Sequence, residues 1–347
     1  MSRQGRVRRR PPTLQDVARL AGVSTAVVSY VINDGPRGVA PATRERVLDA
    51  IETLGYRPNS SARALRRGAT HLIGVLLPDI VNPFHAEFVA ALDNAAAARQ
   101  YSILLATTHH DPEREYSMLA NLLDRGIDGL LILTYLYDRR SYTAAADRVP
   151  RVMIDESSMG RLSPLVGPDL RQGAELAASH LIGHGHTRIG FVTGALPGGS
   201  VDFRRIGWES VLGGHGLAAS LVETTEWSRA GGYEGARRLL DRAAPPTAIF
   251  AGSDLLAVGV LQALHERGLD CPGDIAVISF DGTTESQFSW PPLTTVRHPF
   301  EAISTAAVDT LISGDTDVEP RVLPMELIVR QSCGCPPSGD GSAREGT

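Results

Sequence analysis

Polar and aromatic residues that suit the binding of a small molecule follow directly after several short apolar runs. Asp281 follows "IAVISF", Asp155 follows "RVMI", and Phe84 and His85 stand in "NPFH" after the run "LIGVLLPDI". A carboxylate can accept hydrogen bonds from two hydroxyl or amine groups of a ligand. An aromatic ring can lie against a ligand, although aromatic side chains are more often buried in a core. These residue types predict ligand binding.

Residues with catalytic or metal-binding potential do not form a recognisable set in the sequence. His184 and His186 in "HGHTR" have no carboxylate or cysteine partner at metal-ligand spacing. Cys333 and Cys335 in "SCGCPP" lack a second ligand pair, which a four-ligand zinc site requires. With Cys271 they make only three cysteines, too few for a disulfide framework. The glycine-rich stretches lack the phosphate-loop lysine. We therefore expect no enzyme, no cofactor and no metal.

The elements that must position these residues alternate between two types from residue 72 onward. Short apolar runs such as "LIGVLLPDI", "SILLATT", "RIGFVTG" and "IAVISFDG" alternate with stretches of helical spacing at 87–99, 174–181 and 255–267. This alternation predicts parallel sheets with helices on both faces, and the number of runs suits two sheets. Ligands bind beyond the carboxyl ends of strands in such sheets. The residues after each run are therefore the binding candidates.

Residues 13–55 have a different pattern, one of short helices with short breaks. Thr13 is a predicted helix cap, and a stripe of Leu14, Val17, Ala18 and Ala21 has the spacing of one helix face. Gly22 predicts the turn that follows this helix. Two helices joined by such a turn fit a helix-turn-helix motif, in which the second helix enters the major groove.

The second and third helices are predicted from caps and spacing in the same way. Ser24 caps the second helix, in which four valine and isoleucine residues recur at helical spacing. The third helix opens at Pro41 and ends at Gly55. We expect its inner face to consist of Val47, Leu48, Ile51 and Leu54.

The charge of the chain is divided unevenly between this segment and the rest. Residues 1–68 contain 13 arginines against 5 acidic residues, and the remainder contains 21 arginines against 34 acidic residues. A small basic head on an acidic body predicts that the head binds a polyanion such as DNA. The alternative for the head is an ordinary helical hairpin.

Several motifs resemble the LacI/GalR family of bacterial transcription regulators. The head matches in "TLQDVARLAGVS" and "ATRERVLDAIETLGYRPN". The body matches in "GVLLPDIVNPFHAEFVAAL", "HLIGHGHTRIGFVTG", "AIFAGSDLLAVGVLQALHERGL" and "SFDG…PPLTTVRHP". The resemblance implies an all-α helix-turn-helix head and a hinge helix. It also implies a two-lobed α/β core like that of periplasmic sugar-binding proteins, and a homodimer on a near-palindromic double-stranded operator.

The resemblance and the helix-turn-helix pattern together identify the predicted DNA contacts. They are Thr13, Leu14, Ser24, Thr25, Ala26, Val27, Ser29, Tyr30, Asn33, Tyr56, Asn59, Ala62 and Leu65. The family most often has Thr where Val27 stands and Arg where Tyr30 stands, so the preferred half-site is expected to differ from the common one. In the hinge, the resemblance implies that Leu65 wedges into a minor-groove step.

The resemblance adds three residues to the predicted effector site. Trp227 matches a position where the family places an aromatic ring against the effector, and Arg204 matches the ligand-holding arginine. Ser253 stands where many sugar-binding members have Asn, and Asp254 beside it suits a helix cap as well as a ligand contact. With Phe84, Trp227 could sandwich a ring, for which we expect a sugar in preference to a purine.

These observations predict the following organisation. A basic tail at 1–12 precedes the head at 13–57, the hinge at 58–70 and the effector and dimerisation domain at 71–332, with a disordered tail at 333–347. We expect one lobe from 71–167 plus 296–319 and the other from 168–295 plus 320–332.

Two other classes of protein are consistent with parts of the sequence. A sugar-binding protein without a DNA role would account for the body alone, and a sugar-modifying enzyme is the third alternative. The basic head and the missing signal peptide oppose the former, and no nucleophile or acid–base pair supports the latter. With no apolar run of membrane-spanning length, a cytoplasmic location is expected.

Overall fold

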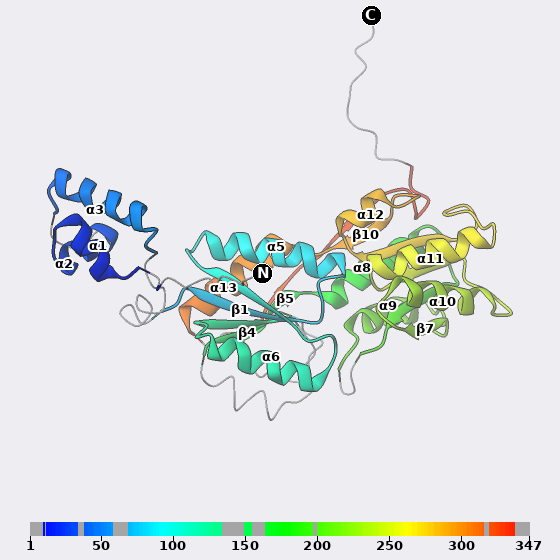
Figure 1. The fold of residues 1–347 in the computed structure, drawn as a ribbon. Coiled ribbons are helices and arrows are strands. Elements are labelled where there is room, and N and C mark those ends of the chain that lie inside the picture. The colour runs from blue at the N-terminus through cyan, green and yellow to red at the C-terminus, as the bar shows by residue number, and fades with distance from the viewer. Residues whose placement is uncertain are drawn as a thin grey trace, which may run out of the picture. The chain divides into compact units, whose positions relative to one another are not determined.

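The computed structural model describes residues 10, 12–33, 38–57, 69–133, 149–154, 164–196, 200–315 and 319–336. The chain divides into two compact units, residues 1–70 and 71–347. Figure 1 shows the helices of the first unit, and the sheets of the second unit with helices covering them. Asn59, Ala62, Leu65 and Asp155 lie outside the described residues, so the predictions made for them stay predictions.

The first unit consists of α1 (Leu14–Ala21), α2 (Thr25–Asn33) and α3 (Pro41–Leu54). Thr13 caps α1 in a reciprocal capping box with Asp16, and Gly22 ends it with φ of 65° in the left-handed region. The Ser24 hydroxyl accepts a hydrogen bond from the Val27 amide at 3.4 Å, at the start of α2. The predicted caps and the glycine turn are therefore present.

The core of this unit is narrow. Val17, Val28 and Val47 are fully buried where the three helices meet. The prediction that Leu48 faces inward is wrong, because its side chain is 48% exposed, and Ala50 is buried on α3 instead. Three short helices bury only a thin stripe of each helix, so a position one residue off that stripe lies in solvent.

The first lobe of the second unit is a four-stranded parallel sheet in the order β2-β1-β3-β4. Its strands are β1 (Leu72–Leu77), β2 (Ser102–Thr107), β3 (Gly129–Ile132) and β4 (Arg151–Met153). Helices α5 (Pro83–Ala97) and α13 (Phe300–Ser313) cover one face, and α6 (Pro112–Asp124) covers the other (Figure 1).

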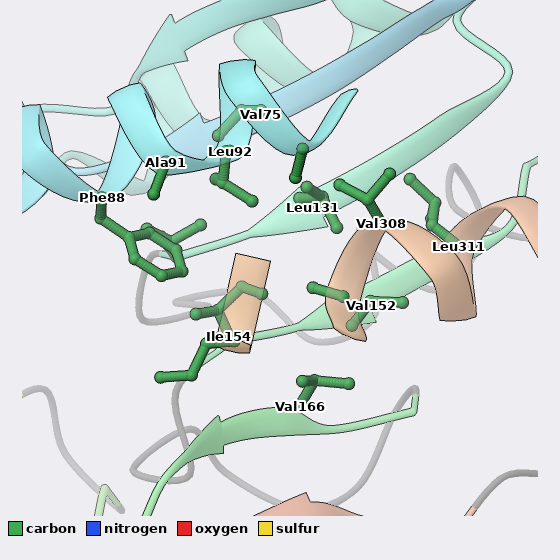
Figure 2. Close-up of a cluster of buried hydrophobic side chains, with 14 of the residues drawn as sticks. Val75, Phe88, Ala91, Leu92, Leu131, Val152, Ile154, Val166, Val308 and Leu311 are labelled. Atoms are coloured by element: carbon green, nitrogen blue, oxygen red, sulfur yellow. The ribbon is translucent and has the colours of Figure 1, made fainter. Parts of the chain in front are cut away.

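Alternation along the strands divides this lobe's core into two layers. Val75 of β1 points toward α5, and Figure 2 shows it beside Leu92. Leu131 and Val308 belong to the same layer. Leu76, the next residue of β1, packs into the layer under α6. Because both faces are apolar, the strands read as continuous apolar runs, as parallel strands do.

The second lobe is a six-stranded sheet in the order β12-β10-β9-β8-β6-β7. The strands are β6 (Ile189–Gly194), β7 (Val222–Thr225), β8 (Ala248–Ala251), β9 (Ala276–Asp281), β10 (Thr294–Arg297) and β12 (Glu326–Ile328). Only β12 is antiparallel to its neighbour among the described strands. The predicted architecture of parallel sheets is confirmed.

Helices cover both faces of this second sheet. The side chains of α8 (Leu170–Gly183) and α9 (Phe203–Gly214) share one apolar layer with Phe191, Phe250 and Phe280. Those of α10 (Arg229–Leu240) and α11 (Asp254–Glu266) share the other. A short helix, α12 (Thr284–Phe288), follows β9.

The chain crosses between the lobes more than once, which brings distant segments together. β5 (Val166–Pro168) pairs with β11 (Arg321–Leu323) in a separate two-stranded sheet. Cys333, which we expected to begin a disordered tail, is 1% exposed and lies in the core of the second lobe. Among the described residues no helix is long and apolar enough to cross a membrane.

Candidate functional site

A cleft in the second unit is lined by residues from both lobes. It contains about 820 Å³ of space not filled by protein atoms, part of it continuous with solvent. Six of the seven predicted effector residues line it, namely Phe84, His85, Arg204, Trp227, Ser253 and Asp281. These residues converge because the carboxyl ends of the parallel strands meet at the cleft, where ligands bind in sheets of this type.

Asp281 ends β9 and is the most buried acid of the cleft. Its side chain is almost fully enclosed, and its φ of 104° is unusual for a residue other than glycine. Burial raises the pKa of Asp281 to about 7, while the Arg204 guanidinium opposes this effect. The His298 Nε2 atom lies 3.5 Å from Asp281 Oδ1. This carboxyl group can therefore gain or lose a proton near neutral pH.

Arg204 presents a buried cation to the same cleft. The first turn of α9 positions it, because the Asp202 carboxylate caps that helix and also accepts a hydrogen bond from the Thr193 hydroxyl at 3.0 Å. The guanidinium carbon lies 4.7 Å from the centre of the Phe280 ring and 5.4 Å from the centre of the Trp227 ring. Its Nε atom is buried without a hydrogen-bond partner. A buried donor of this kind favours a ligand acceptor.

Trp227 lies flat against the end of β6. Its Nε1 atom donates a hydrogen bond to the Ala195 carbonyl at 3.1 Å, which sets the orientation of the indole. A Cβ atom on Gly194 would lie 2.2 Å from the indole, so only glycine allows this packing. The end of β6 therefore holds the Trp227 indole in place as one wall of the cleft.

Phe84 and His85 enter the cleft from the start of α5, which Asn82 caps. The centre of the Phe84 ring lies 4.9 Å from that of His298 and 5.6 Å from that of Phe300. Phe84 is thus part of an aromatic group that belongs partly to the core. This arrangement leaves part of the ring available to a ligand, since Phe84 is only half-buried.

Asp79 and His110 also line the cleft and were missed by the sequence analysis. The His85 ring beside Asp79 lowers the pKa of that carboxyl group, and the amides of Asn82 and Val81 add to the effect. The His110 Nε2 atom lies 3.9 Å from Asp79 Oδ2. Asp79 follows the end of β1 in "LLPDI", a position that predicts a ligand contact. His110 follows the end of β2 and His298 directly follows β10, so their positions after strands carried the same signal.

Ser253 and Asp254 differ in role although they are adjacent. The Ser253 hydroxyl caps α11 by accepting a hydrogen bond from the Leu256 amide at 3.1 Å. Asp254 accepts hydrogen bonds from the Thr283 amide at 2.6 Å and the Thr295 hydroxyl at 2.8 Å, and also from Ser279. It does not line the cleft. Asp254 joins α11 to β9 and β10, which is a structural role.

The predicted DNA contacts that the structure describes differ in how exposed they are. Thr25 and Ala26, at the start of α2, are exposed, whereas Ser29 and Tyr30 are half-buried. Asn33 donates to the Ser29 carbonyl at 2.9 Å and thus closes the last turn of α2. The Thr13 hydroxyl donates to Asp16 at 2.7 Å within the capping box. The remaining predicted contacts in this unit are Leu14, Ser24, Val27 and Tyr56. An exposed helix start is what a major-groove contact requires.

The sequence and the fold were compared with known proteins. Residues 13–59 match the bacterial regulatory proteins of the lacI family, and residues 178–333 match the periplasmic binding protein-like domain. The chain is 37% identical to the ribose operon repressor of Escherichia coli strain K12, over 86% of this chain and 92% of that protein. The chain belongs to the LacI family.

Other LacI-family members are similar over nearly the whole chain. The transcriptional repressor PurR of Glaesserella parasuis is 34% identical, over 92% of this chain and 98% of that protein. The crystal structure of the lac repressor dimer bound to operator and an anti-inducer has a TM-score of 0.84 and 30% identity. It covers 93% of this chain and 99% of the lac repressor chain.

LacI-family membership confirms three sequence predictions. The chain is a DNA-binding transcriptional regulator with a helix-turn-helix head, and its core has the two-lobed periplasmic-binding-protein-like fold. Its relatives are transcriptional repressors, so the prediction that it is not an enzyme is confirmed as well. Members of this family bind operators as dimers and respond to small molecules such as sugars.

Proposed function

We propose that this protein is a homodimeric repressor that binds a near-palindromic operator and responds to a small sugar in its cleft. The observation that carries the proposal is the Arg204 guanidinium, which is buried beside Asp281 with its Nε atom unpaired. A buried cation next to a buried acid offers both a donor and an acceptor to one ligand. Burying these groups costs stability, which is offset when a ligand pairs with them.

The chemistry of the cleft favours a sugar over a purine. Asp281 and Asp79 supply carboxylate oxygens, which accept hydrogen bonds from neighbouring hydroxyl groups. Phe84 and Trp227 supply apolar ring faces, which suit the C–H face of a sugar. The ribose operon repressor is a relative at 37% identity, which supports a pentose. The PurR relative keeps a purine as the second candidate, because the same rings could stack on one.

The head would read the operator through the start of α2. Thr25 and Ala26 would contact base edges, and Tyr30 would contribute one hydroxyl group and a ring face. Two heads on a dimer would bind half-sites about one helical turn apart. The contacts proposed for Asn59, Ala62 and Leu65 in the hinge rest on the sequence alone, and a role for Asp155 in effector binding does as well.

The first test is selection of bound sites from random duplex DNA with the full-length protein at near-physiological salt. A two-half-site palindrome is expected, and Tyr30→Arg is expected to change the preferred half-site. Salt-sensitive DNA binding without sequence preference, both with and without sugars, would contradict the operator proposal.

The second test measures binding of D-ribose, D-glucose, D-galactose and hypoxanthine by calorimetry, followed by their effect on operator affinity. A sugar that binds and weakens operator binding supports the proposal. Binding of hypoxanthine alone would replace the sugar with a purine and leave the operator proposal intact.

A further inference from the structure

Four potential metal ligands meet at one edge of the second lobe, away from the cleft. They are His180 and His184 at the end of α8, and Cys333 and Cys335 in the segment that follows β12. The ligand atoms of these four side chains all lie within 4.8 Å of one another. Spacing in the sequence does not indicate this cluster, because about 150 residues separate the histidines from the cysteines.

The distances within the cluster approach those of a tetrahedral site. The Cys335 Sγ atom lies 3.2 Å from His184 Nε2 and 3.6 Å from His180 Nε2. Zinc bonds of about 2.0–2.1 Å to nitrogen and about 2.3 Å to sulfur separate tetrahedral ligand atoms by roughly 3.3–3.8 Å. Small side-chain movements would therefore bring all four ligand atoms onto one ion.

The local structure presents both pairs to the same point. His180 and His184 are four residues apart at the end of a helix, so they lie on one face, and their ring centres are 4.8 Å apart. On the other side, Gly334 has a φ of 92°, which turns the chain between the two cysteines. A helix face and a glycine turn thus each supply two ligands.

Cys333 anchors the site from within the core. Its side chain is buried, and the Thr294 hydroxyl of β10 donates a hydrogen bond to its Sγ atom at 3.1 Å. Hydrogen bonds of this kind orient metal ligands from the second layer of a site. The other ligands are more accessible, since His184 is exposed and His180 and Cys335 are half-buried. A metal ion could therefore reach the site from solvent.

We propose that His180, His184, Cys333 and Cys335 form a structural Zn²⁺ site that fastens the C-terminal segment to α8. Two thiolates and two imidazoles are a ligand set typical of structural zinc sites. Four protein ligands leave no open position, so the site has a structural role. The bound ion lies outside the effector cleft and requires neither operator nor sugar.

The test uses the full-length protein, reduced and freed of metal with a chelator, and titrated with ZnCl₂ or CoCl₂. We expect one ion per chain, and a Co²⁺ spectrum with the intense visible bands of a tetrahedral site and thiolate charge transfer. Zn²⁺ should also raise the melting temperature and protect two thiols from alkylation. A Cys333–Cys335 disulfide in the purified protein, or no stoichiometric binding, would overturn the proposal.

Ligand and control variants make the test specific. Cys335→Ser and His184→Asn remove accessible ligands, and each should weaken Zn²⁺ binding by about 100-fold or more, since even a lost second-layer group costs about 10–100-fold. Cys271→Ser and His186→Asn alter a cysteine and a histidine outside the cluster, and should bind as the unaltered protein does. The far-UV circular dichroism spectrum of every variant reports that it is folded. Equal metal binding by ligand and control variants would contradict the proposal.

Discussion

At the scale of single residues, the cleft holds two opposite charges in surroundings that exclude most water. Arg204 is 8% exposed and Asp281 is 3% exposed. The Arg204 guanidinium favours the charged form of Asp281, yet burial still raises the pKa of Asp281 to about 7. A ligand that donates a hydrogen bond to Asp281 and accepts one from Arg204 would therefore pair with both buried groups.

Arg204→Gln should separate effector binding from operator binding. Because hydrogen bonds to charged groups contribute about 1.5–3 kcal/mol, the affinity for the effector should fall by roughly 10–100-fold. Operator affinity should be unchanged, so the variant should repress without being induced. Calorimetry and operator binding measure the two effects.

Arg205→Gln is the matched control for this variant. Arg205 is exposed and paired with Glu209 on the surface of α9, at 2.7 Å. Its loss should change neither affinity. An equal loss of effector affinity in the two variants would show that the buried guanidinium has no special role.

Asp281 should also make the stability of the ligand-free protein depend on pH. The unfolded chain releases this proton near the ordinary value of 3.8, whereas the folded chain keeps it until about pH 7. The stabilisation is complete below the unfolded value and is lost as the pH rises through about 7. The free energy of unfolding of the unaltered protein should therefore fall relative to Asp281→Asn between about pH 4 and about pH 7. Chemical denaturation at several pH values measures it, and parallel pH profiles would contradict the assignment.

At the scale of elements, the cleft is built from strand-to-helix turns that are closed by side-chain caps. Asn82, Asp202 and Ser253 cap α5, α9 and α11, and each cap is itself a cleft residue or lies two residues from one. A capped turn fixes the direction in which the helix leaves the strand. The ligand-facing side chains are therefore held by the beginnings of helices.

Gly194→Ala should disturb the cleft without unfolding the lobe. The added methyl group would lie 2.2 Å from the Trp227 ring, so the indole must move away from β6. Effector affinity should fall by roughly 2- to 13-fold, because stacked aromatic contacts contribute about 0.5–1.5 kcal/mol, and the tryptophan fluorescence should change.

Gly213→Ala provides the comparison, because a Cβ atom there has no other atom within 4 Å. It should leave the effector affinity and fluorescence unchanged. If Gly194→Ala behaves in the same way, the indole does not form a wall of the ligand site.

At the scale of the whole molecule, function depends on two units that are folded separately. The head has its own small core, and the two-lobed unit has the cleft. A sugar can regulate DNA binding only if it prefers one arrangement of the protein over another. The two sites are then linked by a single coupling free energy.

This linkage predicts a reciprocal effect. If D-ribose, or whichever sugar binds, lowers operator affinity by some factor, operator DNA should lower the affinity for that sugar by the same factor, typically about 5–150-fold. Calorimetry with and without operator, and operator titrations with and without the sugar, give the two factors independently. A sugar that binds equally well to free and operator-bound protein would exclude regulation through the cleft.

The sequence by itself determined the local elements and the residues at their ends. Helical spacing with Thr13 and Gly22 predicted α1 and its turn. Apolar runs predicted β9, which ends at Asp281, and β1, which precedes the start of α5 where Phe84 lies. The tertiary structure alone decided which distant side chains meet. It buried Ala50 in place of Leu48, placed His298 beside Asp281, and brought Cys335 to His184. The reason is physical: spacing and caps act between neighbours in the chain, whereas these contacts depend on how separate elements pack.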